Sequence, residues 1–595
     1  MASIKLTKEQ INTKMDFIKE YGGEGNAATK SELDPNANVT HKNLCTLAAE
    51  LNKDVNVQVN RAFMYNKIQE LFGTELADEY IRQLEEHEIY AHDETHLQSY
   101  CLSATMYPFI SEGLKGIGGI STPPKHLDSY CGSFINLVYA LSSQFAGACG
   151  IPEALVYFDY LARKDYGNDY LKTNKGKIKN CLQQLVYSLN QPAGSRAFQS
   201  PFTNFSVYDK NYFNAIFDGF TFPDGDKPCW DTVNKLQEFF LHWFNKEREK
   251  ALLTFPVVTA SILTKDGDVE DEQVAEYLCR ELAEGNSFFM YMSDSADSIS
   301  SCCRLQNGIT DNTFSNSMGA GGVATGSINV ITVNLNRIYQ QGIDLEETIR
   351  KVHKYQVAYR KIMEEFKAQG MLPAYDAMFI SMEKQYLTIG INGFVEAAEY
   401  LGVEISDNAD YKKFTEMTLG TINKLNKEAR QEYGYLFNCE MVPGESLGSK
   451  FAKWDKEAGL KVNRDCYNSY MYKVEDNLIN PIEKFHLHGR DYMKYLDGGS
   501  ALHLNLDEHP TKEQYRMLMK IAAQTGCPYW TTNIPNTVCK DCGNIDKRYL
   551  GKCPACGSEN TAYATRVIGY LKLVDNFSMD RQKEALRRVY SKQIN

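Results

Sequence analysis

The feature that most constrains the fold of this chain is the alternation of short strand-like runs with helical patterns. Runs that are rich in β-branched residues, or that alternate between apolar and polar residues, predict strands at 287–294, 327–335, 386–393, 437–443 and 501–506. Apolar residues at three-to-four spacing predict helices at 231–252, 270–284, 343–370, 393–401 and 410–432. Alternating strands and helices favour an α/β fold, and in a chain of 595 residues we expect the sheet to close into a barrel.

The two ends of the chain differ from this body. Residues 1–90 are predicted to be mainly helical, because "HKNLCTLAAELNKDVNVQVNRAFMYNKIQELFG" and "ELADEYIRQLEEHEIYAHD" carry apolar residues at helical spacing. The stretch 125–162 is apolar nearly all round, as in a buried helix or helix pair. From residue 527 the sequence becomes turn-rich and punctuated by cysteine. We therefore predict a helical N-terminal region (1–90), a catalytic α/β domain (91–526) and a small C-terminal module (527–595).

Composition argues against several classes of function. The formal net charge of −12 disfavours a general nucleic-acid-binding protein, which needs a basic surface to neutralise phosphates. No apolar run reaches the roughly 18–20 residues of a membrane helix, and the N-terminal sequence lacks the apolar core of a signal peptide. We therefore expect a cytoplasmic protein without a membrane partner, in which most of the 16 cysteines are reduced, buried packing residues.

Four of the cysteines form a motif of their own. In "CKDCGNIDKRYLGKCPACG", two C-x-x-C knuckles are each followed by a glycine that permits a tight turn; their cysteines are Cys539, Cys542, Cys553 and Cys556. Four thiolates at this spacing predict one tetrahedral Zn²⁺ site, and the alternatives are two unrelated redox pairs or an iron–sulfur cluster. A site closed by four thiolates leaves no open position for a substrate, so we expect this zinc to be structural.

A glycine interrupts the strand-like run that follows this motif. Gly569 lies within "YATRVIGYLKLVDNF", where a glycine has no side chain to pack and weakens a strand. A bulge or a close backbone approach would explain such a residue. However, "RVIGYL" resembles the radical loop of the glycyl radical enzymes. A radical on a glycine Cα is delocalised over the flanking amide and carbonyl groups, and the resemblance implies that Gly569 stores such a radical.

A stored radical needs a relay that can take hydrogen from a substrate, and "SISSCCRLQNG" offers one. Cys302 and Cys303 are adjacent there; without Gly569 they would indicate two packing cysteines. Adjacent thiols also occur in pyruvate formate-lyase, so a glycyl radical acyltransferase of that type is the alternative function. The zinc knuckles before the radical loop are absent from that family's pattern, whereas they are characteristic of class III (anaerobic) ribonucleoside-triphosphate reductases.

The order of further segments also resembles the class III reductases, from about residue 40 to residue 590. These segments are "EIYAHDETHLQSYCLSATMYP", "CCRL", "INVITVNLNRI", "CEMVPGES", "DGGSALHLNL" and "NIPNTVCKDCG". The resemblance implies a ten-stranded α/β barrel of the glycyl radical enzyme type that reduces ribonucleoside triphosphates to deoxyribonucleoside triphosphates. It also implies a homodimer with dNTP and ATP effectors, and a separate radical-SAM activase that carries S-adenosylmethionine and a [4Fe–4S] cluster.

The same resemblance implies roles for individual residues. The Gly569 radical would take hydrogen from Cys303, whose thiyl radical would remove the 3′-hydrogen of the ribose. Loss of the 2′-hydroxyl as water then needs an acid and a source of electrons. Cys101 matches the second thiol of the family, which donates hydrogen at C2′ from the opposite face of the ribose.

The electron source is predicted from a departure from one branch of that family. Formate-using members carry an asparagine on the strand after the thiyl loop, where this chain has Ser327. We therefore expect a thioredoxin- or glutaredoxin-like reductant rather than formate. Cys439 and Glu440 are of types suited to thiol exchange and proton transfer. Glu440 fits a strand-edge carboxylate equally well, and Glu445 is the other candidate for the acid or base.

Other features predict no additional site. "SMGAGGVATGS" (317–327) lacks both the Walker lysine and the G-x-G-x-x-G spacing, so we expect an active-site loop and not a phosphate cradle. His92 and His96 are at helical spacing without an evident third ligand, and we assign no metal to them. Many members of the family that this chain resembles carry an N-terminal ATP-cone, a domain that controls overall activity. Residues 1–40 are too short for that domain, so we expect weak or absent inhibition by dATP. A non-catalytic zinc-ribbon protein is a third hypothesis that rests on the knuckles alone.

Overall fold

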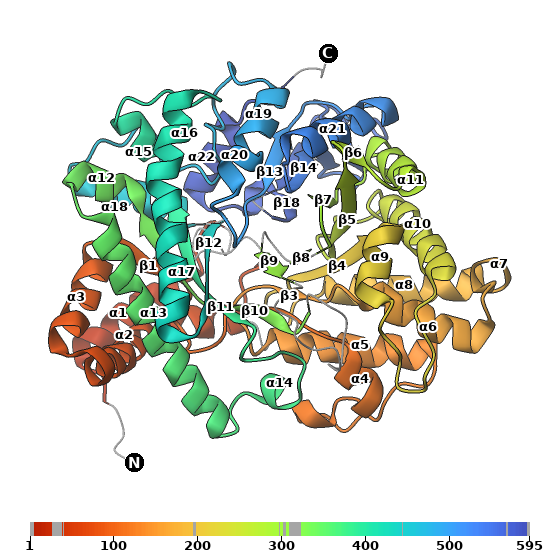
Figure 1. Cartoon of the computed structure of the whole chain (residues 1–595), viewed down its shortest axis with the longest axis horizontal. Coiled ribbons are helices and arrows are strands. Elements are labelled where there is room, and N and C mark those ends of the chain that lie inside the picture. Colours follow the sequence, from red (N-terminus) through yellow and green to blue (C-terminus); the bar gives the residue numbers. More distant parts are fainter. Residues whose placement is uncertain are drawn as a thin grey trace.

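The computed structural model of the chain describes residues 5–25, 39, 41–193, 198–296, 298–301, 305–308, 323–442, 444, 446–566 and 569–591. A ring of strands lies at the centre, and helices surround it (Figure 1). The longest of the described strands, β10 (Thr325–Asn334), is buried at every position. Such burial on both faces is expected where helices cover a largely parallel sheet.

Within the described part of the chain, ten strands form the ring. Their hydrogen-bonded order is β12 (Leu436–Met441), β11 (Gln385–Asn392), β10, β2 (Cys101–Ser103), β3 (Cys149–Gly150), β4 (Thr203–Tyr208), β5 (Val257–Lys265), β7 (Phe289–Ser293), β14 (Tyr529–Asn533) and β13 (Leu502–Asn505). Two short strands pair beside the ring, β1 (Ile89–Ala91) with β10 and β6 (Asp268–Val269) with β5.

The ring consists of two parallel halves that meet at antiparallel seams. One half is β2, β3, β4, β5 and β7, and the other is β10 to β14. The seams are the pairs β10–β2 and β7–β14. Just before β13, Gly499 bridges Glu440 of β12, and the Met441 amide donates to the Gly499 carbonyl at 3.1 Å. The sheet therefore closes on itself, and the predicted ten-stranded α/β barrel is confirmed.

Helices precede the barrel, connect its strands and cover its outer face. They are α1 (Lys8–Tyr21), α2 (Leu44–Phe72), α3 (Thr74–Glu85), α4 (Tyr107–Glu112), α5 (Leu127–Ser142), α6 (Ala154–Tyr166), α7 (Tyr170–Thr173), α8 (Lys175–Leu189), α9 (Lys210–Phe217), α10 (Trp230–Glu247), α11 (Glu272–Ala283), α12 (Leu335–Gln341), α13 (Leu345–Ala368), α14 (Pro373–Asp376), α15 (Phe394–Tyr400), α16 (Ala409–Thr415), α17 (Thr421–Tyr433), α18 (Leu447–Glu457), α19 (Pro481–Leu487), α20 (Arg490–Met493) and α21 (Lys512–Thr525). Among the described helices, none combines the length and apolar character needed to span a membrane.

A short hairpin enters the barrel. β8 (Ser298–Ser301) and β9 (Leu305–Gly308) pair antiparallel, with Ser301 opposite Leu305. β8 contacts β4 and β5, while β9 contacts β10 in the other half of the barrel. In Figure 1 the two strands lie within the ring. Because this hairpin touches both halves, it occupies the barrel interior.

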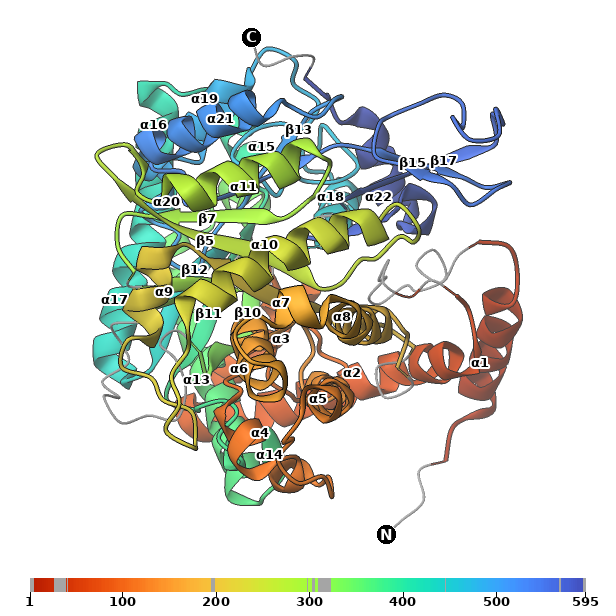
Figure 2. The ribbon, with the colours of Figure 1, turned by 90° about the vertical axis from the view of Figure 1, so that its right-hand side faces the viewer.

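The C-terminal module is a small sheet followed by a helix. β15 (Asn536–Cys539), β16 (Ile545–Asp546), β17 (Thr561–Arg566) and β18 (Leu571–Leu573) pair antiparallel in the order β16-β15-β17-β18. The helix α22 (Met579–Arg587) follows them. Figure 2 shows β15 and β17 at the edge of the molecule. The start of β17 pairs with Cys539, so β17 connects the cysteine motif to the turn that follows Arg566 at the end of this strand.

Candidate functional site

The glycine singled out in the sequence lies between β17 and β18. Arg566 at the end of β17 is paired with Leu571 at the start of β18, and Gly569 is buried in the turn between them. The hydroxyl of Thr254 donates to the Leu571 carbonyl at 3.0 Å. Thr254 lies just before β5, so this hydrogen bond joins the turn to the barrel.

Aromatic contacts place the same turn at one end of the barrel. The ring of Tyr570 lies 5.2 Å from that of Phe202 and 5.8 Å from that of Phe255, measured between centroids. Phe202 precedes β4 directly and Phe255 precedes β5 by two residues. The turn that carries Gly569 is therefore packed against the barrel end at which these two strands begin.

Arg566 binds the backbone of Gly569 directly. Its Nη1 donates to the Gly569 carbonyl at 2.9 Å, and its Nη2 donates to the Ser287 carbonyl at 2.9 Å and to the Ser287 hydroxyl at 2.7 Å. The guanidinium lies 4.4 Å from the centroid of the Phe289 ring. Burial lowers the pKa of Arg566 to about 10, and among the described residues no carboxylate forms an ion pair with it. Its charge is thus directed at carbonyl oxygens.

The helix α22 and its C-cap residue, Arg588, form hydrogen bonds that hold this turn in place. Arg588 Nη1 donates to the Arg566 carbonyl at 2.7 Å, and Glu584 holds Arg588 through two hydrogen bonds of 2.8 Å. Arg581, which also pairs with Glu584, donates to the Gly444 carbonyl in the loop after β12 at 2.8 Å. The C-terminal module therefore fixes both the Gly569 turn and the loop of the barrel beside it.

Cys101 begins β2, at the same end of the barrel as the residues that contact the Gly569 turn. The Leu102 amide donates to the Ala148 carbonyl, and the Cys149 amide donates to the Phe202 carbonyl. Cys101 therefore lies at the barrel end where Phe202 packs on Tyr570. The Ala148 amide donates to Cys101 Sγ at 3.3 Å.

Neighbouring residues of Cys101 leave room for its sulfur and bear on the reductant. A Cβ on Gly147 would lie only 2.6 Å from Cys101 Sγ, so a residue with a side chain there would displace the thiol. On β10, Ser327 is the register partner of Cys101, and its hydroxyl is 2.8 Å from that of Thr388. Ser327, on which the prediction about the reductant depends, is thus directly beside Cys101.

The predicted thiyl residue Cys303, and its neighbour Cys302, lie outside the described residues. The strands on either side of them, β8 and β9, form the hairpin inside the barrel. Glu445 also lies outside the described residues. Their roles stay predictions.

Cys439 and Glu440 are neighbours on β12 and point to opposite faces of the sheet, as successive residues of a strand do. The ring of Phe437 contacts His353 of α13 on the outer face, which by alternation is also the face of Cys439. Burial raises the pKa of the Cys439 thiol well above its usual range, and the side chain is fully buried. Glu440, 8% exposed, therefore faces the barrel interior.

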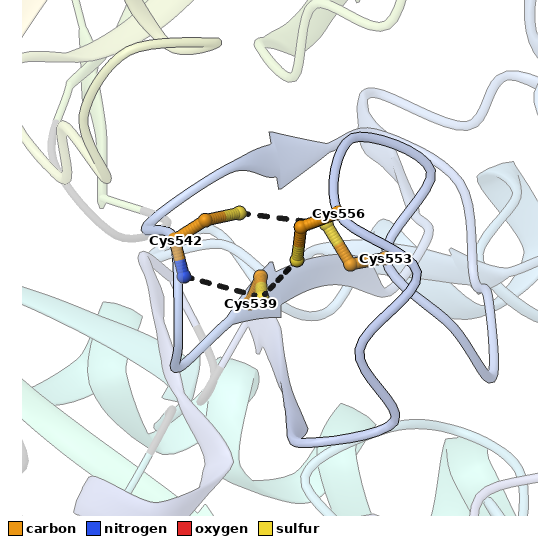
Figure 3. A group of neighbouring side chains, drawn as sticks. All are labelled: Cys539, Cys542, Cys553 and Cys556. Atoms are coloured by element: carbon orange, nitrogen blue, oxygen red, sulfur yellow. Dashed lines mark hydrogen bonds between the residues drawn. The ribbon is translucent and has the colours of Figure 1, made fainter.

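The four cysteines of the C-terminal motif converge at the start of β17 (Figure 3). Cys539 Sγ lies 3.6 Å from Cys556 Sγ, and Cys542 Sγ lies 3.6 Å from Cys553 Sγ. Sulfurs bound to one tetrahedral zinc at about 2.3 Å are about 3.8 Å apart. The residues that follow the knuckles, Gly543 and Gly557, have a φ of 75°, which glycine adopts without strain. The motif therefore fits a metal ion such as zinc.

The contacts of Arg566 are the part of the site that the sequence does not reveal. The motif "RVIGYL" contains Arg566, but Ser287 is 279 residues away and belongs to no recognisable pattern. Arg588 and Glu584 likewise read as ordinary charges of a surface helix, although both are buried.

Comparisons with known proteins bear on the activity of this site. The family model for anaerobic ribonucleoside-triphosphate reductase matches residues 49–590. One solved structure, an anaerobic ribonucleotide reductase, is 29% identical with a TM-score of 0.84, and the match covers 100% of this chain and 99% of that chain. Another is the anaerobic ribonucleotide reductase from Thermotoga maritima in complex with dATP and CTP, at 29% identity and a TM-score of 0.82, covering 98% and 100%.

A more distant match concerns the fold alone. A glycyl radical enzyme from Archaeoglobus fulgidus is 12% identical to the chain with a TM-score of 0.50, and the match covers 98% of this chain and 78% of that chain. A comparison with curated proteins gave no match.

Proposed function

We propose that this chain, which belongs to the anaerobic ribonucleoside-triphosphate reductase family and is an oxidoreductase, works through a radical stored at Gly569 and relayed by Cys303. The reaction replaces the 2′-hydroxyl of the ribose by hydrogen. It consumes two electrons and two protons and releases one water. The protein must therefore supply a hydrogen-atom acceptor, an acid and a connection to an external reductant.

The proposed sequence of steps balances at each stage. The Gly569 Cα radical takes a hydrogen atom from Cys303 Sγ, and the resulting thiyl radical takes the 3′-hydrogen of the ribose. The 2′-hydroxyl leaves as water with a proton from an acid. The 3′-hydroxyl releases its proton in this step. Cys101 then gives a hydrogen atom to C2′ and becomes a thiyl radical. A thiolate of the dithiol reductant joins this thiyl in a disulfide radical anion, which returns one electron to the ribose as the 3′-oxygen takes up a proton. Cys303 gives its hydrogen atom back to C3′ and regains its thiyl radical, and the second thiol of the reductant resolves the mixed disulfide and restores the Cys101 thiol.

The observation that carries this proposal is the position of the Gly569 turn. It is buried at the barrel end where Cys101 begins β2, while the hairpin on either side of Cys303 lies inside the barrel. A buried radical is protected from water and oxygen, and a relay inside a closed barrel can reach a substrate held there. Glu440 faces the same interior and is our candidate for the acid.

The reductant that we propose is a thioredoxin- or glutaredoxin-like dithiol, since Ser327 occupies the position beside Cys101. A role for Cys439 in thiol exchange stays a prediction. Its full burial and raised pKa disfavour the thiolate that such exchange requires. We expect the Cys439→Ala variant to form deoxynucleotide at most of the rate of the parent chain.

The partners follow from the family. The Thermotoga maritima reductase was solved with dATP and CTP, and we propose ribonucleoside triphosphates as substrates and nucleoside triphosphates as effectors of this chain. We further propose a homodimer, and a radical-SAM activase that forms the Gly569 radical. The predicted division into residues 1–90, 91–526 and 527–595 is part of this proposal.

Anaerobic turnover tests the function directly. The chain is incubated without oxygen with a radical-SAM activase, S-adenosylmethionine and CTP, and the deoxynucleotide is quantified by chromatography. We expect dCTP with a thioredoxin system and little or none with formate. Product with formate alone would overturn the proposed reductant, and absence of product with every reductant, despite a Gly569 radical, would overturn the function.

The four-cysteine motif is proposed to hold a structural zinc ion that the residues Cys539, Cys542, Cys553 and Cys556 bind as thiolates. Such an ion supplies folding energy and no chemistry of its own. Because Cys539 pairs with the start of β17, the ion would fix the strand that ends at the Gly569 turn.

Replacing one zinc ligand should therefore disable activation from a distance. We expect Cys542→Ser to lose one tightly bound zinc per chain and most of its Gly569 radical, because β17 loses its anchor. Metal analysis and EPR spectroscopy measure the two effects. Cys45→Ser is the control, since Cys45 is an exposed thiol remote in sequence. A variant with full radical yield and no zinc would contradict the anchoring role.

Arg566 is proposed to act as a positioning residue for the Gly569 turn. The Arg566→Gln variant lacks the charged hydrogen bonds of Arg566, which contribute about 1.5–3 kcal/mol. The equilibrium between the turn packed against the barrel end and the turn detached from it should therefore shift towards the detached form by about 10- to 100-fold. Hydrogen exchange at the Tyr570 amide reports this shift, and the lifetime of the EPR signal reports its effect on the radical. Arg548→Gln is a matched control, because Arg548 is exposed and pairs with Asp546. Unchanged exchange in Arg566→Gln would refute the role.

A further inference from the structure

A second group of possible metal ligands lies on the outer helices, outside the barrel interior, and shares no residue with the four-cysteine motif. His242 is in the second-to-last turn of α10, Glu281 is near the end of α11, and Glu284 directly follows α11. One ligand atom from each residue lies within 4.8 Å of the other two. The two helices run side by side on the outside of the barrel (Figure 2).

The separations within this group match those around a shared ion. His242 Nδ1 lies 3.4 Å from Glu281 Oε1 and 3.7 Å from Glu284 Oε2. Two ligand atoms at about 2.1 Å from one ion, at a tetrahedral angle, are about 3.4 Å apart. One imidazole nitrogen with two carboxylate oxygens suits a divalent ion of the zinc class.

The carboxylate of Glu281 supplies an independent argument for a cation site. Its side chain is fully buried, and its Oε2 has no hydrogen-bond partner among the described residues. Arg280 reaches only the other oxygen, Oε1, at 3.1 and 3.2 Å, and makes a shorter contact of 2.8 Å with Glu238. A buried carboxylate oxygen without a partner is costly, and a divalent cation that binds both oxygens of Glu281, Oε1 beside His242 and Oε2, would satisfy it.

The group is also open to solvent on one side. The side chains of His242 and Glu284 are 51% and 41% exposed, so an ion can enter and water can complete its coordination. The same place receives the C-terminal module. Lys547, in the segment between the two cysteine knuckles, donates through Nζ to the Glu284 carbonyl at 3.1 Å. Asn245 of α10 donates to the Glu281 carbonyl at 3.3 Å.

We propose that His242, Glu281 and Glu284 form a second divalent metal site of the zinc class, distinct from the four-cysteine site. The ion ties the ends of α10 and α11 together at the point where Lys547 docks. It thereby stabilises the surface on which the module that carries Gly569 rests. It takes no part in the transfer of hydrogen.

Calorimetric titration of Zn²⁺ into the full chain tests the site. The chain carries no affinity tag, and its thiolate site is filled with zinc beforehand. We expect one further binding event per chain, weakened at least 100-fold in His242→Ala and in Glu281→Gln. Glu238→Gln is the matched control, because Glu238 is on α10 and contacts Arg280 but is no ligand; it should bind as the parent chain does. Circular dichroism verifies that the variants are folded.

Co²⁺ as a probe separates this site from the thiolates. Co²⁺ added to the zinc-loaded chain should give d–d absorption without the sulfur-to-metal charge-transfer band that thiolate ligands produce. No additional binding to the parent chain, or equal binding to the parent chain and both ligand variants, would overturn the proposal. A charge-transfer band that accompanies the additional binding would overturn it as well.

Discussion

Gly569→Ala should abolish deoxynucleotide formation and the radical signal together. A glycine radical keeps one hydrogen on Cα, which splits its EPR signal into a doublet, and it can flatten because no side chain clashes with the turn. Alanine adds a methyl group at a position that is buried against the barrel end. We expect the loss of turnover to be about 10³-fold or more, as for other residues without which the chemistry cannot start.

The measurement uses two independent signatures of a radical at this residue. Activation of the parent chain should give the doublet, and incorporation of glycine deuterated at Cα should narrow it. Exposure of the activated chain to air should cleave the backbone at Gly569 and leave a fragment that ends near Ile568. Mass spectrometry identifies the fragment.

Gly551→Ala is the control for this experiment. Gly551 lies in the same C-terminal module, and a Cβ built there meets no atom within 4 Å. It should therefore keep both the doublet and the turnover. A doublet in Gly569→Ala, or an intact parent chain after exposure of the activated protein to air, would contradict the assignment.

The sequence predicted the parts of the fold that carry strong periodic signals. The predicted strands at 327–335, 386–393 and 437–443 are β10, β11 and β12, and the stretch 125–162 contains α5 and most of α6. The zinc knuckles were also visible, because cysteine spacing is a local property. In the structure the four sulfurs lie close enough together to hold one metal ion such as zinc.

Other barrel strands escaped the sequence analysis because they are too short or too uniformly buried. β3 has two residues and β2 has three, and such short segments cannot show an alternation of apolar and polar residues. β4 is buried at all six positions, so no polar face marks it as a strand. The predicted helix 410–432 is interrupted by a π-helical turn at Glu416–Gly420. That turn separates α16 from α17, and the continuous apolar periodicity gave no sign of it.

The candidate site was predictable where it depends on local motifs, and unpredictable where it depends on contacts across the barrel. Gly569 and Cys101 were selected from their neighbours in sequence. The hold of Arg566 on Ser287, across 279 residues, has no local signature. Alternation along β12 shows a further limit: the sequence grouped Cys439 with Glu440, but the helix α13 covers the face of only one of them. Tertiary packing, which decides which face is interior, was needed to separate the two.

Cys303→Ser should lose turnover by about 10³-fold or more while the Gly569 doublet still forms, because the activase acts on Gly569 and needs no relay. A serine hydroxyl holds its hydrogen too strongly for a glycine radical to remove. Cys302→Ser, its neighbour, should keep turnover within about a few-fold, since one thiyl radical is sufficient for the reductase chemistry. EPR spectroscopy and dCTP quantification on the same activated samples give both readouts.

The pair of variants also distinguishes the two radical chemistries that adjacent cysteines permit. An acyl transfer of the pyruvate formate-lyase type passes an acyl group between both sulfurs, so it would fail equally in either variant. The reductase needs one sulfur, that of Cys303, to generate and later quench the substrate radical, and a second sulfur, that of Cys101 on β2, to supply hydrogen at C2′. Cys101→Ser should therefore lose dCTP formation as severely as Cys303→Ser does, whereas Cys302→Ser should retain it. Equal loss in Cys302→Ser and Cys303→Ser, with full activity in Cys101→Ser, would exclude the relay proposed for this chain.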